Sequence, residues 1–401
     1  MLEHVHEYVI VGGGLAGASA IDGIREVDAE GSIALIAAEH YYPYHRPPLS
    51  KKLWFGKQTV DKIWVNKEDY YSANGVDVAL GTNAAEINPA NKTVRTDAGD
   101  VFHYKKLLIA AGASPRRLPI PGGELDGICY LRYLADYEAL KAATEIGKSA
   151  LVIGGGFIGS EIAAALNINS VEVTMVFPED YICNRVFPES LGLSIHDDYI
   201  LRGIKLLSGD SVASIEKDGS GFKVQIRSGK ELKTDMIIAG IGVEPELGLA
   251  HNAGLETQKG ILVNEYLQTS SPDVYAAGDC ATFPYQALGA LMRLEHWDNA
   301  LNQGKQAGRN MAGAGESYAY MPYFFSDLFD FGYEAVGEVD TRLDIFADWQ
   351  EENKTGVIYY LRDGAVRGAM MCNVWDQAPA ARELIKSGKK VDPKELRGAI
   401  R

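Results

Sequence analysis

Three glycines near the start of the chain have the spacing that suits a nucleotide pyrophosphate. In Tyr8–Ala20, YVIVGGGLAGASA, they are Gly12, Gly14 and Gly17, directly after an apolar run. The first glycine permits a tight turn, the second lets the backbone approach the pyrophosphate, and the third lets a helix pack closely on a strand. The start of that helix would offer N–H groups and its positive dipole end to the phosphates. This stretch therefore predicts a dinucleotide site.

The same pattern occurs again in Ser149–Glu161. Gly154, Gly156 and Gly159 follow the apolar run Ala150–Ile153 at the spacing of the first three glycines. The repeat predicts a second dinucleotide-binding βαβ unit in the same chain.

An acidic residue closes the second strand of each unit. Glu39 follows Ile33–Ala38, and Glu179 follows Val173–Val176 in the same register. An acid at this point accepts a hydrogen bond from a ribose hydroxyl.

The second acid also indicates which coenzyme is used. Glu179 and Asp180 would together repel a 2′-phosphate, which predicts a preference for NADH over NADPH. Arg185 lies close by in sequence and leaves NADPH open as the alternative.

Three further polar residues suit nucleotide chemistry. Arg46 and Lys51 lie in a proline-containing loop, HRPPLSK, that holds its segment extended. Arg46 suits a phosphate and Lys51 suits the role of a point charge, although a solvated basic loop fits the spacing equally well. Asp279 follows an apolar strand and a glycine, so it could accept from a polyol such as ribitol or cap a helix.

Composition limits the classes of function. The 401 residues have 46% hydrophobic and 23% charged content, which predicts a globular protein of two or three domains. The net charge of -15 argues against nucleic acid or anionic membrane as a partner. No apolar stretch approaches the roughly 18 residues of a membrane span, and the polar start predicts no targeting peptide, so we expect a cytoplasmic protein.

The cysteines predict neither a metal site nor a disulfide. The four cysteines form no CxxC pair and are expected to be buried free thiols; they are Cys129, Cys183, Cys280 and Cys372.

The elements that must position these residues follow in order. A strand-like stretch runs over Val76–Ala111, and prolines from Pro115 to Pro121 predict a domain boundary. Further strands are expected at Ile204–Leu206, Phe222–Ile226 and Leu232–Ala239.

The last part of the chain changes character. Gly332–Val339 and Gly356–Val374 alternate like an antiparallel sheet with a hairpin turn at Asp363-Gly364. Ala378–Lys386 is expected to be a helix closed by Gly388, and a short link is expected at about Thr341–Thr355.

Several motifs together resemble a known family. They are VIVGGGLAG, RPPLSK, LLIAAGASPR, LVIGGGFIGSE, VFPE, VYAAGDC, LEHWDNA, FFSDL, GYEAVGEVD and GVIYYLRDGAVRG. Over nearly its whole length the chain resembles the two-dinucleotide flavoprotein reductases of the glutathione-reductase fold, in the branch of apoptosis-inducing factor and the ferredoxin reductases.

The resemblance implies an α/β fold with two Rossmann-like dinucleotide-binding domains and a small C-terminal α+β domain. The FAD-binding domain would comprise residues 1–121 and 245–320, the NADH-binding domain 122–244, and the C-terminal domain 321–401.

The resemblance also implies the residues that hold the two cofactors. Those expected at FAD are Gly12, Gly14, Leu15, Ala16, Gly17, Glu39, His40, Arg46, Lys51, Ala85, Gly112, Arg132, Asp279, His296 and Trp297. Those expected at NADH are Gly154, Gly156, Phe157, Gly159, Glu161, Glu179, Arg185, Gly242, Glu295, Phe325 and Glu334.

Two of these residues are expected to be catalytic. Glu161 falls on the first helical turn after the second glycine motif, and the resemblance pairs it with Lys51 beside the flavin. Lys51 would stabilise negative charge on reduced flavin while Glu161 holds it in place; a structural ion pair is the alternative. Phe157 would cover the flavin ring and move when nicotinamide enters, or else simply pack in a core. Phe325 stands where the family usually has tryptophan, so its stacking on nicotinamide would be weaker.

Two classes of function fit this pattern. The first is an NADH-dependent reductase that passes electrons through FAD to a ferredoxin, a rubredoxin or another acceptor. The second is a redox sensor like apoptosis-inducing factor, in which a long-lived FADH–NAD charge-transfer complex turns over slowly. Disulfide or peroxide reduction lacks its cysteine, since none precedes Cys129. We expect a monomer or an NADH-dependent homodimer, no bound metal, and the reductase rather than the sensor, because the chain is compact.

Overall fold

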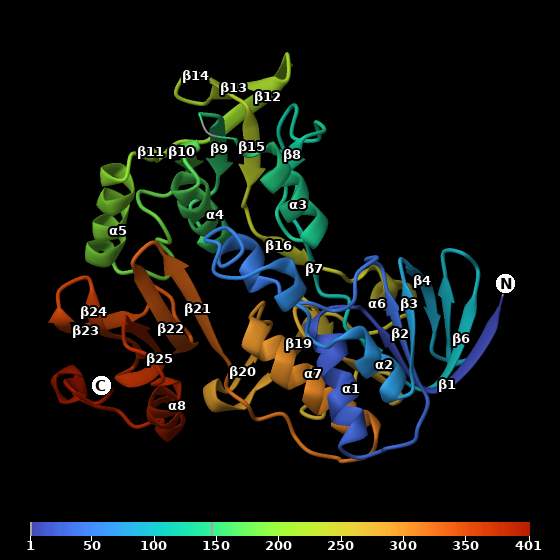
Figure 1. The fold of residues 1–401 in the computed structure, drawn as a ribbon. Helices are drawn as coiled ribbons and strands as arrows, with labels where there is room; N and C mark the ends of the chain where they lie inside the picture. The colour runs from blue at the N-terminus through green and yellow to red at the C-terminus, as the bar shows by residue number, and fades with distance from the viewer. Residues whose placement is uncertain (1, 146) are drawn as a thin grey trace. The chain divides into compact units, whose positions relative to one another are not determined.

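The computed structural model describes residues 2–145 and 147–401. It divides into two compact units (Figure 1). The first unit comprises Met1–His45, Val60–Ser114 and Glu244–Tyr323. The second comprises Arg46–Thr59, Pro115–Val243 and Phe324–Arg401. The chain thus crosses between them at the proline stretch that begins with Pro115.

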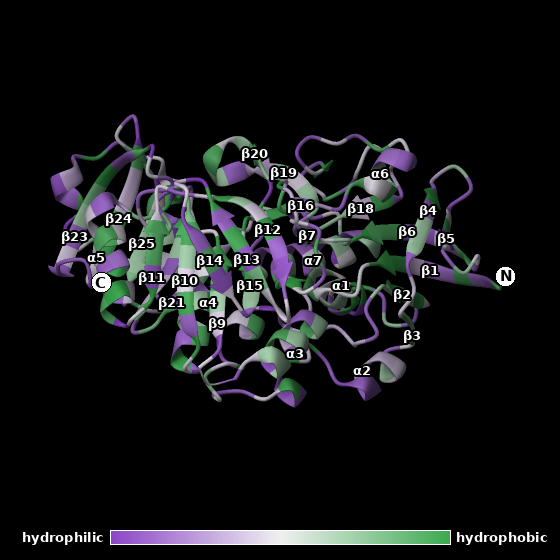
Figure 2. Cartoon of the chain, turned by 90° about the horizontal axis from the view of Figure 1, so that it is seen from above, coloured by the Kyte–Doolittle hydropathy of each residue, from purple (hydrophilic) through white to green (hydrophobic). Residues whose placement is uncertain are grey.

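A mixed sheet is the centre of the first unit. Its strands run in the order β3-β2-β1-β6-β5-β4, and β18 pairs with β6. They are β1 Glu3–Val11, β2 Ile33–Ala37, β3 Val76–Leu80, β4 Ala84–Asn88, β5 Thr93–Thr96, β6 Val101–Ile109 and β18 Val274–Ala276. The parallel strands are apolar because both faces are covered: all five residues of β2 are buried. Figure 2 shows β1 changing from hydrophilic at the N-terminus to hydrophobic, in line with burial of its second half.

Helices and a small sheet complete the first unit. The helices are α1 Leu15–Arg25, α2 Glu68–Ala73, α6 Gly248–Asn252 and α7 Trp297–Met311, with 3-10 turns η2 Val60–Lys62 and η3 Gln286–Leu288. The small sheet has β17 Ile261–Leu262, β19 Ala281–Tyr285 and β20 Ala290–Met292. Helices α1 and α7 lie side by side (Figure 1), and a Cβ on Gly304 of α7 would come within 2.2 Å of the Ala16 oxygen.

The second unit contains a parallel sheet in the order β11-β10-β9-β15-β8. Its strands are β8 Ile128–Cys129, β9 Ser149–Ile153, β10 Glu172–Phe177, β11 Lys205–Ser208 and β15 Met236–Ala239. A three-stranded antiparallel sheet consists of β12 Val212–Asp218, β13 Gly221–Ile226 and β14 Glu231–Thr234. The helices are η1 Pro47–Ser50, α3 Leu134–Ala143, α4 Phe157–Ile168 and α5 Glu189–Leu201. The short strands β7 Ala113–Pro115 and β16 Val243–Pro245 contain two of the points where the chain changes units.

The C-terminal part of the second unit is an antiparallel sheet with a helix. The strand order is β21-β22-β25-β24-β23. The elements are β21 Tyr323–Leu328, β22 Phe331–Gly337, β23 Asp344–Glu351, β24 Thr355–Arg362, β25 Ala365–Cys372, α8 Ala378–Ser387 and η4 Pro393–Leu396. Asp363 and Gly364 both have positive φ, 54° and 80°, as a two-residue hairpin of type I′ requires. The predicted hairpin and the predicted helix closed by Gly388 are confirmed.

Two expectations about elements were wrong. The single strand expected over Leu232–Ala239 is two strands in different sheets, because β14 ends at Thr234 and β15 begins at Met236. The supposed link Thr341–Thr355 contains β23, which pairs along β24. None of the residues of β23 is fully buried, so no continuous buried apolar run marks the strand in the sequence. Among the described residues all four cysteines are free, and Cys129 is half-buried rather than buried.

Candidate functional site

In the first unit, the first glycine motif forms a tight loop after β1. Gly12 has φ +127°, and a Cβ on it would lie 2.1 Å from the Ala110 oxygen. A Cβ on Gly17 would lie 2.0 Å from the Gly12 oxygen. Both distances are far inside van der Waals contact, so only glycine fits at these two positions.

The loop leaves a cradle over Gly14. A Cβ on Gly14 would meet no described atom within 4 Å. The N-cap Gly14 has no side chain that could accept from the first turn of α1, so no side chain caps the first N–H groups of this helix. The cradle therefore fits the pyrophosphate of a dinucleotide.

Two other predicted residues reach the same edge of the sheet. Val11 of β1 and Ala276 of β18 are both in register with Ile109 of β6, so these parallel strands end together. Gly112 and Asp279 follow β6 and β18 directly. The structure thus brings both to the edge where the glycine loop lies, as ligand sites in parallel sheets require.

The residues expected near the ribose lie just beyond the first βαβ unit. Glu39 stands two residues after β2, and one of its carboxylate oxygens accepts from the Tyr44 hydroxyl at 2.6 Å. His40 and Ala85 are exposed. Glu295, expected at the nicotinamide, belongs to the first unit and pairs with Arg293 at 2.6 Å.

Two histidines lie near the start of α7. His296 is the N-cap of this helix, and burial lowers its pKa to about 4, against the opposing effect of the Asp279 carboxylate. Trp297 donates its indole N–H to Nδ1 of His45 at 2.9 Å. Burial also lowers the pKa of His45, which keeps the imidazole neutral and its Nδ1 able to accept.

The second unit repeats the loop geometry. Gly154 has φ +113°, and its Cβ would lie 2.4 Å from the Gly240 oxygen, while a Cβ on Gly159 would lie 2.1 Å from the Gly154 oxygen. Gly156, like its counterpart in the first unit, has open space where a side chain would be. Gly242 has φ +98° and follows β15, the strand beside β9.

The acidic residue of the second unit lies at the same position relative to its strand as the acidic residue of the first unit. Glu179 lies two residues beyond the end of β10, as Glu39 lies two beyond β2. Both are half-buried, and Asp180 is exposed. The equal register of the two acids, predicted from the sequence, is confirmed.

The loop with Arg185 is tied to the C-terminal sheet. The Thr341 N–H donates to the Arg185 oxygen at 3.0 Å, and the Thr341 hydroxyl donates to the Asn184 oxygen at 2.9 Å. The Arg342 and Arg185 guanidinium groups lower the pKa of Asp340. Arg185 thus has an acidic group near it on the side of the C-terminal sheet.

Lys51 and Glu161 form a buried ion pair in the second unit, with Nζ 3.1 Å from Oε1. Glu161 is the fifth residue of α4 and so begins its second turn rather than lying on the first. Lys51 Nζ also lies 3.4 Å from the Phe325 carbonyl oxygen and 4.3 Å from the centre of the Phe325 ring. The ammonium therefore has a carboxylate, a carbonyl and an aromatic face around it.

Sequence reasoning missed two hydroxyls of this cluster. Ser50 donates to Glu161 Oε2 at 2.6 Å, and Ser326 donates to Oε1 at 2.5 Å. Both serines lie within RPPLSK and FFSDL, motifs that the resemblance had singled out, and this was the available signal.

Arg46 and Arg132, expected at FAD, also meet in the second unit. Arg46 donates from Nη1 to the Arg132 carbonyl oxygen at 2.8 Å, and its guanidinium lies 5.1 Å from the centre of the Tyr133 ring. Together with Lys51 they place three of the expected FAD residues outside the first unit.

Phe157 is part of an aromatic cluster. Its ring centre lies 6.0 Å from that of Phe324 and 6.3 Å from that of Tyr333. Both partners belong to the C-terminal sheet, so any movement of Phe157 exchanges contacts with β21 and β22.

Glu334 of β22 has a carboxylate oxygen without a donor. Its Oε2 is buried and has no hydrogen-bond partner among the described residues. Burial raises the pKa of Glu334, against the opposing effect of the Asp376 N–H. A buried acceptor without a donor fits the amide of a nicotinamide.

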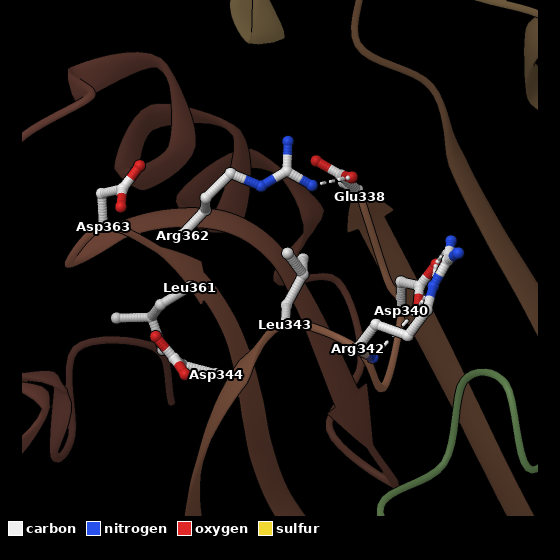
Figure 3. A pocket seen from close by; sticks show the side chains of 8 residues that line it. All are labelled: Glu338, Asp340, Arg342, Leu343, Asp344, Leu361, Arg362 and Asp363. Atoms are coloured by element: carbon white, nitrogen blue, oxygen red, sulfur yellow. Dashed lines mark hydrogen bonds and ion pairs between the residues drawn. The ribbon is translucent and has the colours of Figure 1, made fainter.

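The structure offers little support for other kinds of site. Among residues 2–145 and 147–401 no group of three His, Cys, Asp or Glu side chains is arranged to hold a metal. No helix in this part of the chain could cross a membrane. A pocket of about 440 Å³ lies at one end of β23 and β24, but none of the expected cofactor residues lines it (Figure 3). Its charges largely pair with one another, as in Arg362–Glu338 at 2.7 Å.

Two family models match the chain. Residues 6–304 match the model described as pyridine nucleotide-disulphide oxidoreductase. Residues 307–355 match the model described as apoptosis-inducing factor, mitochondrion-associated, C-term.

Individual proteins match over nearly the full length. The 5,5'-dehydrodivanillate O-demethylase ferredoxin reductase subunit of Sphingobium sp. is 33% identical, over 98% of this chain and 96% of its own. Monodehydroascorbate reductase 3 of Arabidopsis thaliana is 34% identical, over 92% and 90%. A chain in the covalent complex of putidaredoxin reductase with putidaredoxin superimposes with a TM-score of 0.91 at 30% identity, over 98% and 95%.

Proposed function

Because the chain belongs to the pyridine nucleotide-disulphide oxidoreductase family and is an FAD- and NAD(H)-dependent oxidoreductase, we propose that it passes electrons from NADH to a ferredoxin-like carrier protein. The observation that carries the proposal is the end-to-end match to a ferredoxin reductase subunit and to a putidaredoxin reductase in complex with putidaredoxin, the latter with a TM-score of 0.91. A rubredoxin would serve equally well, since both are one-electron carriers.

We propose that the two glycine loops hold the two coenzymes. The loop around Gly14 would hold the FAD pyrophosphate and the loop around Gly156 that of NADH, because each leaves a cradle of the required kind. Asp279 would accept from the FAD ribityl chain. Glu334 would accept from the nicotinamide amide through its buried oxygen.

Hydride transfer needs position more than acid–base chemistry, because the reduced nicotinamide would supply the hydride and FAD would accept it. Lys51 would stabilise the negative charge that the reduced flavin gains. Glu161 would keep the Lys51 ammonium in one place, since its carboxylate lies 3.1 Å away. Phe157 would cover the flavin until nicotinamide enters.

The charges around the adenosine end support NADH over NADPH. Glu179 and Asp180 would repel a 2′-phosphate. Arg185, the group that could attract one, has Asp340 near its guanidinium. Its charge is therefore partly offset within the protein.

A second acceptor class has support of its own. The match to monodehydroascorbate reductase 3 of Arabidopsis thaliana favours a small organic radical as one-electron acceptor. The sensor hypothesis stays a prediction alongside it, with the C-terminal match at residues 307–355 in its favour.

One series of experiments separates the three. NADH is added anaerobically to the FAD-loaded protein, and reoxidation is then followed with ferredoxin and cytochrome c, with ascorbate radical, or with neither. Fast reoxidation by ferredoxin supports the proposal, and fast reoxidation only by the radical replaces it with the second class. A persistent long-wavelength absorbance with a changed gel-filtration volume indicates the sensor and an NADH-dependent homodimer.

A further inference from the structure

The Glu161 carboxylate is held by three side chains from two segments that are distant in sequence, Ser50 with Lys51 and Ser326. Ser50, in η1, donates to Oε2 at 2.6 Å, and Ser326, in β21, donates to Oε1 at 2.5 Å. Lys51 shares Oε1 with Ser326, at 3.1 Å. Each oxygen of the carboxylate thus has at least one donor fixed on a different element of the second unit.

The cluster excludes water. The exposed fractions are 4% for Ser50, 5% for Lys51, 4% for Glu161 and 1% for Ser326. A carboxylate and an ammonium can be buried only where protein groups replace their hydration. The two hydroxyls do this for the carboxylate, and a hydroxyl that donates to a carboxylate favours its charged form.

The geometry of both serines favours Glu161 as the acceptor of their hydroxyl groups. The Ser50 hydroxyl could donate to the Pro47 carbonyl of its own turn, but that oxygen is 3.5 Å away and Glu161 is 2.6 Å away. Ser326 is the buried residue between Phe325 and Asp327, which are both half-buried. The Ser326 side chain therefore lies on the buried face of β21, where its hydroxyl meets the Glu161 carboxylate.

Strand β21 also touches the ammonium directly. The Phe325 carbonyl oxygen is 3.4 Å from Lys51 Nζ, and the Phe325 ring lies over the same atom at 4.3 Å. Two successive residues of one strand thus contact both members of the ion pair.

We propose that Ser50 and Ser326 are positioning residues that hold the Glu161 carboxylate against Lys51, so that strand β21 of the C-terminal sheet is part of the redox site. The proposal rests on the role proposed above for Lys51 and Glu161. It assigns to the C-terminal sheet a function in hydride transfer beyond packing.

Other ionisable groups near the carboxylate add no charge to the cluster. They are Cys183 in the loop after β10, Tyr199 in α5 and Tyr333 in β22. Burial raises the pKa of Cys183 to about 12 and raises the pKa of both tyrosines well above the usual range. All three are therefore neutral at the near-neutral pH of the test described below.

The test compares Ser326→Ala and Ser326→Thr with Ser160→Ala in the FAD-loaded protein. Ser160 is a matched control, because it is buried in the same helix beside Glu161 and its hydroxyl faces the Gly155 oxygen at 3.4 Å. At near-neutral pH, stopped flow gives the limiting rate of flavin reduction and the NADH concentration at half the limiting rate. The midpoint potential of bound FAD and the thermal unfolding temperature are measured in parallel.

We expect Ser326→Ala to lower the limiting rate about ten-fold, as loss of one hydrogen bond to a charged group allows, with little change in the half-saturating NADH concentration. The midpoint potential of the bound FAD should become more negative. Ser326→Thr, which keeps the hydroxyl, should restore both, and Ser160→Ala should behave as the unaltered protein.

Three results would overturn the proposal. They are an unchanged rate and potential in Ser326→Ala, a Ser326→Thr variant as slow as Ser326→Ala, and an equal loss in Ser160→Ala. If Ser326→Ala does not fold, Ser50→Ala and Ser50→Thr make the same comparison from a different segment. A Lys51→Ala variant that reduces FAD at full rate would refute the proposed role of the lysine itself, whereas a slow Lys51→Ala with a normal Ser326→Ala refutes only the serine contacts.

Discussion

Glu161→Gln keeps the shape of the side chain at the centre of the buried cluster and removes its charge. The Lys51 ammonium, with a side chain only 6% exposed, then loses the carboxylate that lies 3.1 Å from its Nζ. Removing one member of a buried ion pair costs about 3–5 kcal/mol, because the other charge is left in a poorly solvated place. We therefore expect Glu161→Gln to lower the free energy of unfolding by about this amount.

A double-mutant cycle isolates the interaction. Lys51→Met alone leaves the carboxylate with its two serine donors and should cost about 3 kcal/mol, whereas Lys51→Met with Glu161→Gln leaves no unpaired charge. The double variant should thus be more stable than the sum of the single effects by about 2–3 kcal/mol. Urea unfolding of the FAD-loaded protein, followed by tryptophan fluorescence, measures all four forms.

Additive single effects, within about 0.5 kcal/mol, would show that Lys51 and Glu161 do not depend on each other. The same four proteins test catalysis. Each single variant should retain FAD but reduce it more slowly with NADH, and stopped-flow bleaching at the unaltered rate in Lys51→Met and Glu161→Gln would refute the catalytic role.

Further predictions concern the coenzymes and acid stability. Glu179→Ala should raise kcat/KM for NADPH about ten-fold, by removing one negative charge, while exposed Glu172→Ala should not; steady-state rates with both coenzymes decide. Gly14→Ala should weaken FAD binding in a titration without lowering the unfolding temperature of the flavin-free protein, because its Cβ meets open space. Gly17→Ala should both weaken FAD binding and lower that unfolding temperature, because its Cβ would lie 2.0 Å from the Gly12 oxygen. His296 has a pKa of about 4 when folded, below its ordinary 6.5, so the neutral form is favoured on folding. The neutral His296 imidazole therefore contributes stability above about pH 6.5, and this contribution is lost as the pH falls toward 4. In a His296→Gln variant the unfolding temperature should change less with pH over that window.

The glycine motifs could be predicted from the sequence because their geometry is local. Gly12 and Gly154 need positive φ, and Gly17 and Gly159 must approach a carbonyl five residues earlier in the chain. These constraints act within one turn. A short stretch of sequence therefore carries them in full, and the repeat of the whole pattern predicted both βαβ units and their acids.

Other features depended on which segments meet. The sequence predicts one strand over Leu232–Ala239, but its two halves pair with strands of different sheets, and β23 is held by its pairing with β24. The residues of a strand do not reveal which distant strand it will pair with.

The sequence alone determined that the chain has two glycine loops, two acids in matching places and an antiparallel C-terminal segment. Only the tertiary structure decided that Ser50 and Ser326, 111 and 165 residues from Glu161, donate to its two carboxylate oxygens. The physical reason is that a buried charge takes its donors from whichever segments surround it. Serine is common in turns and strands, and its type and spacing do not reveal which carboxylate it will face.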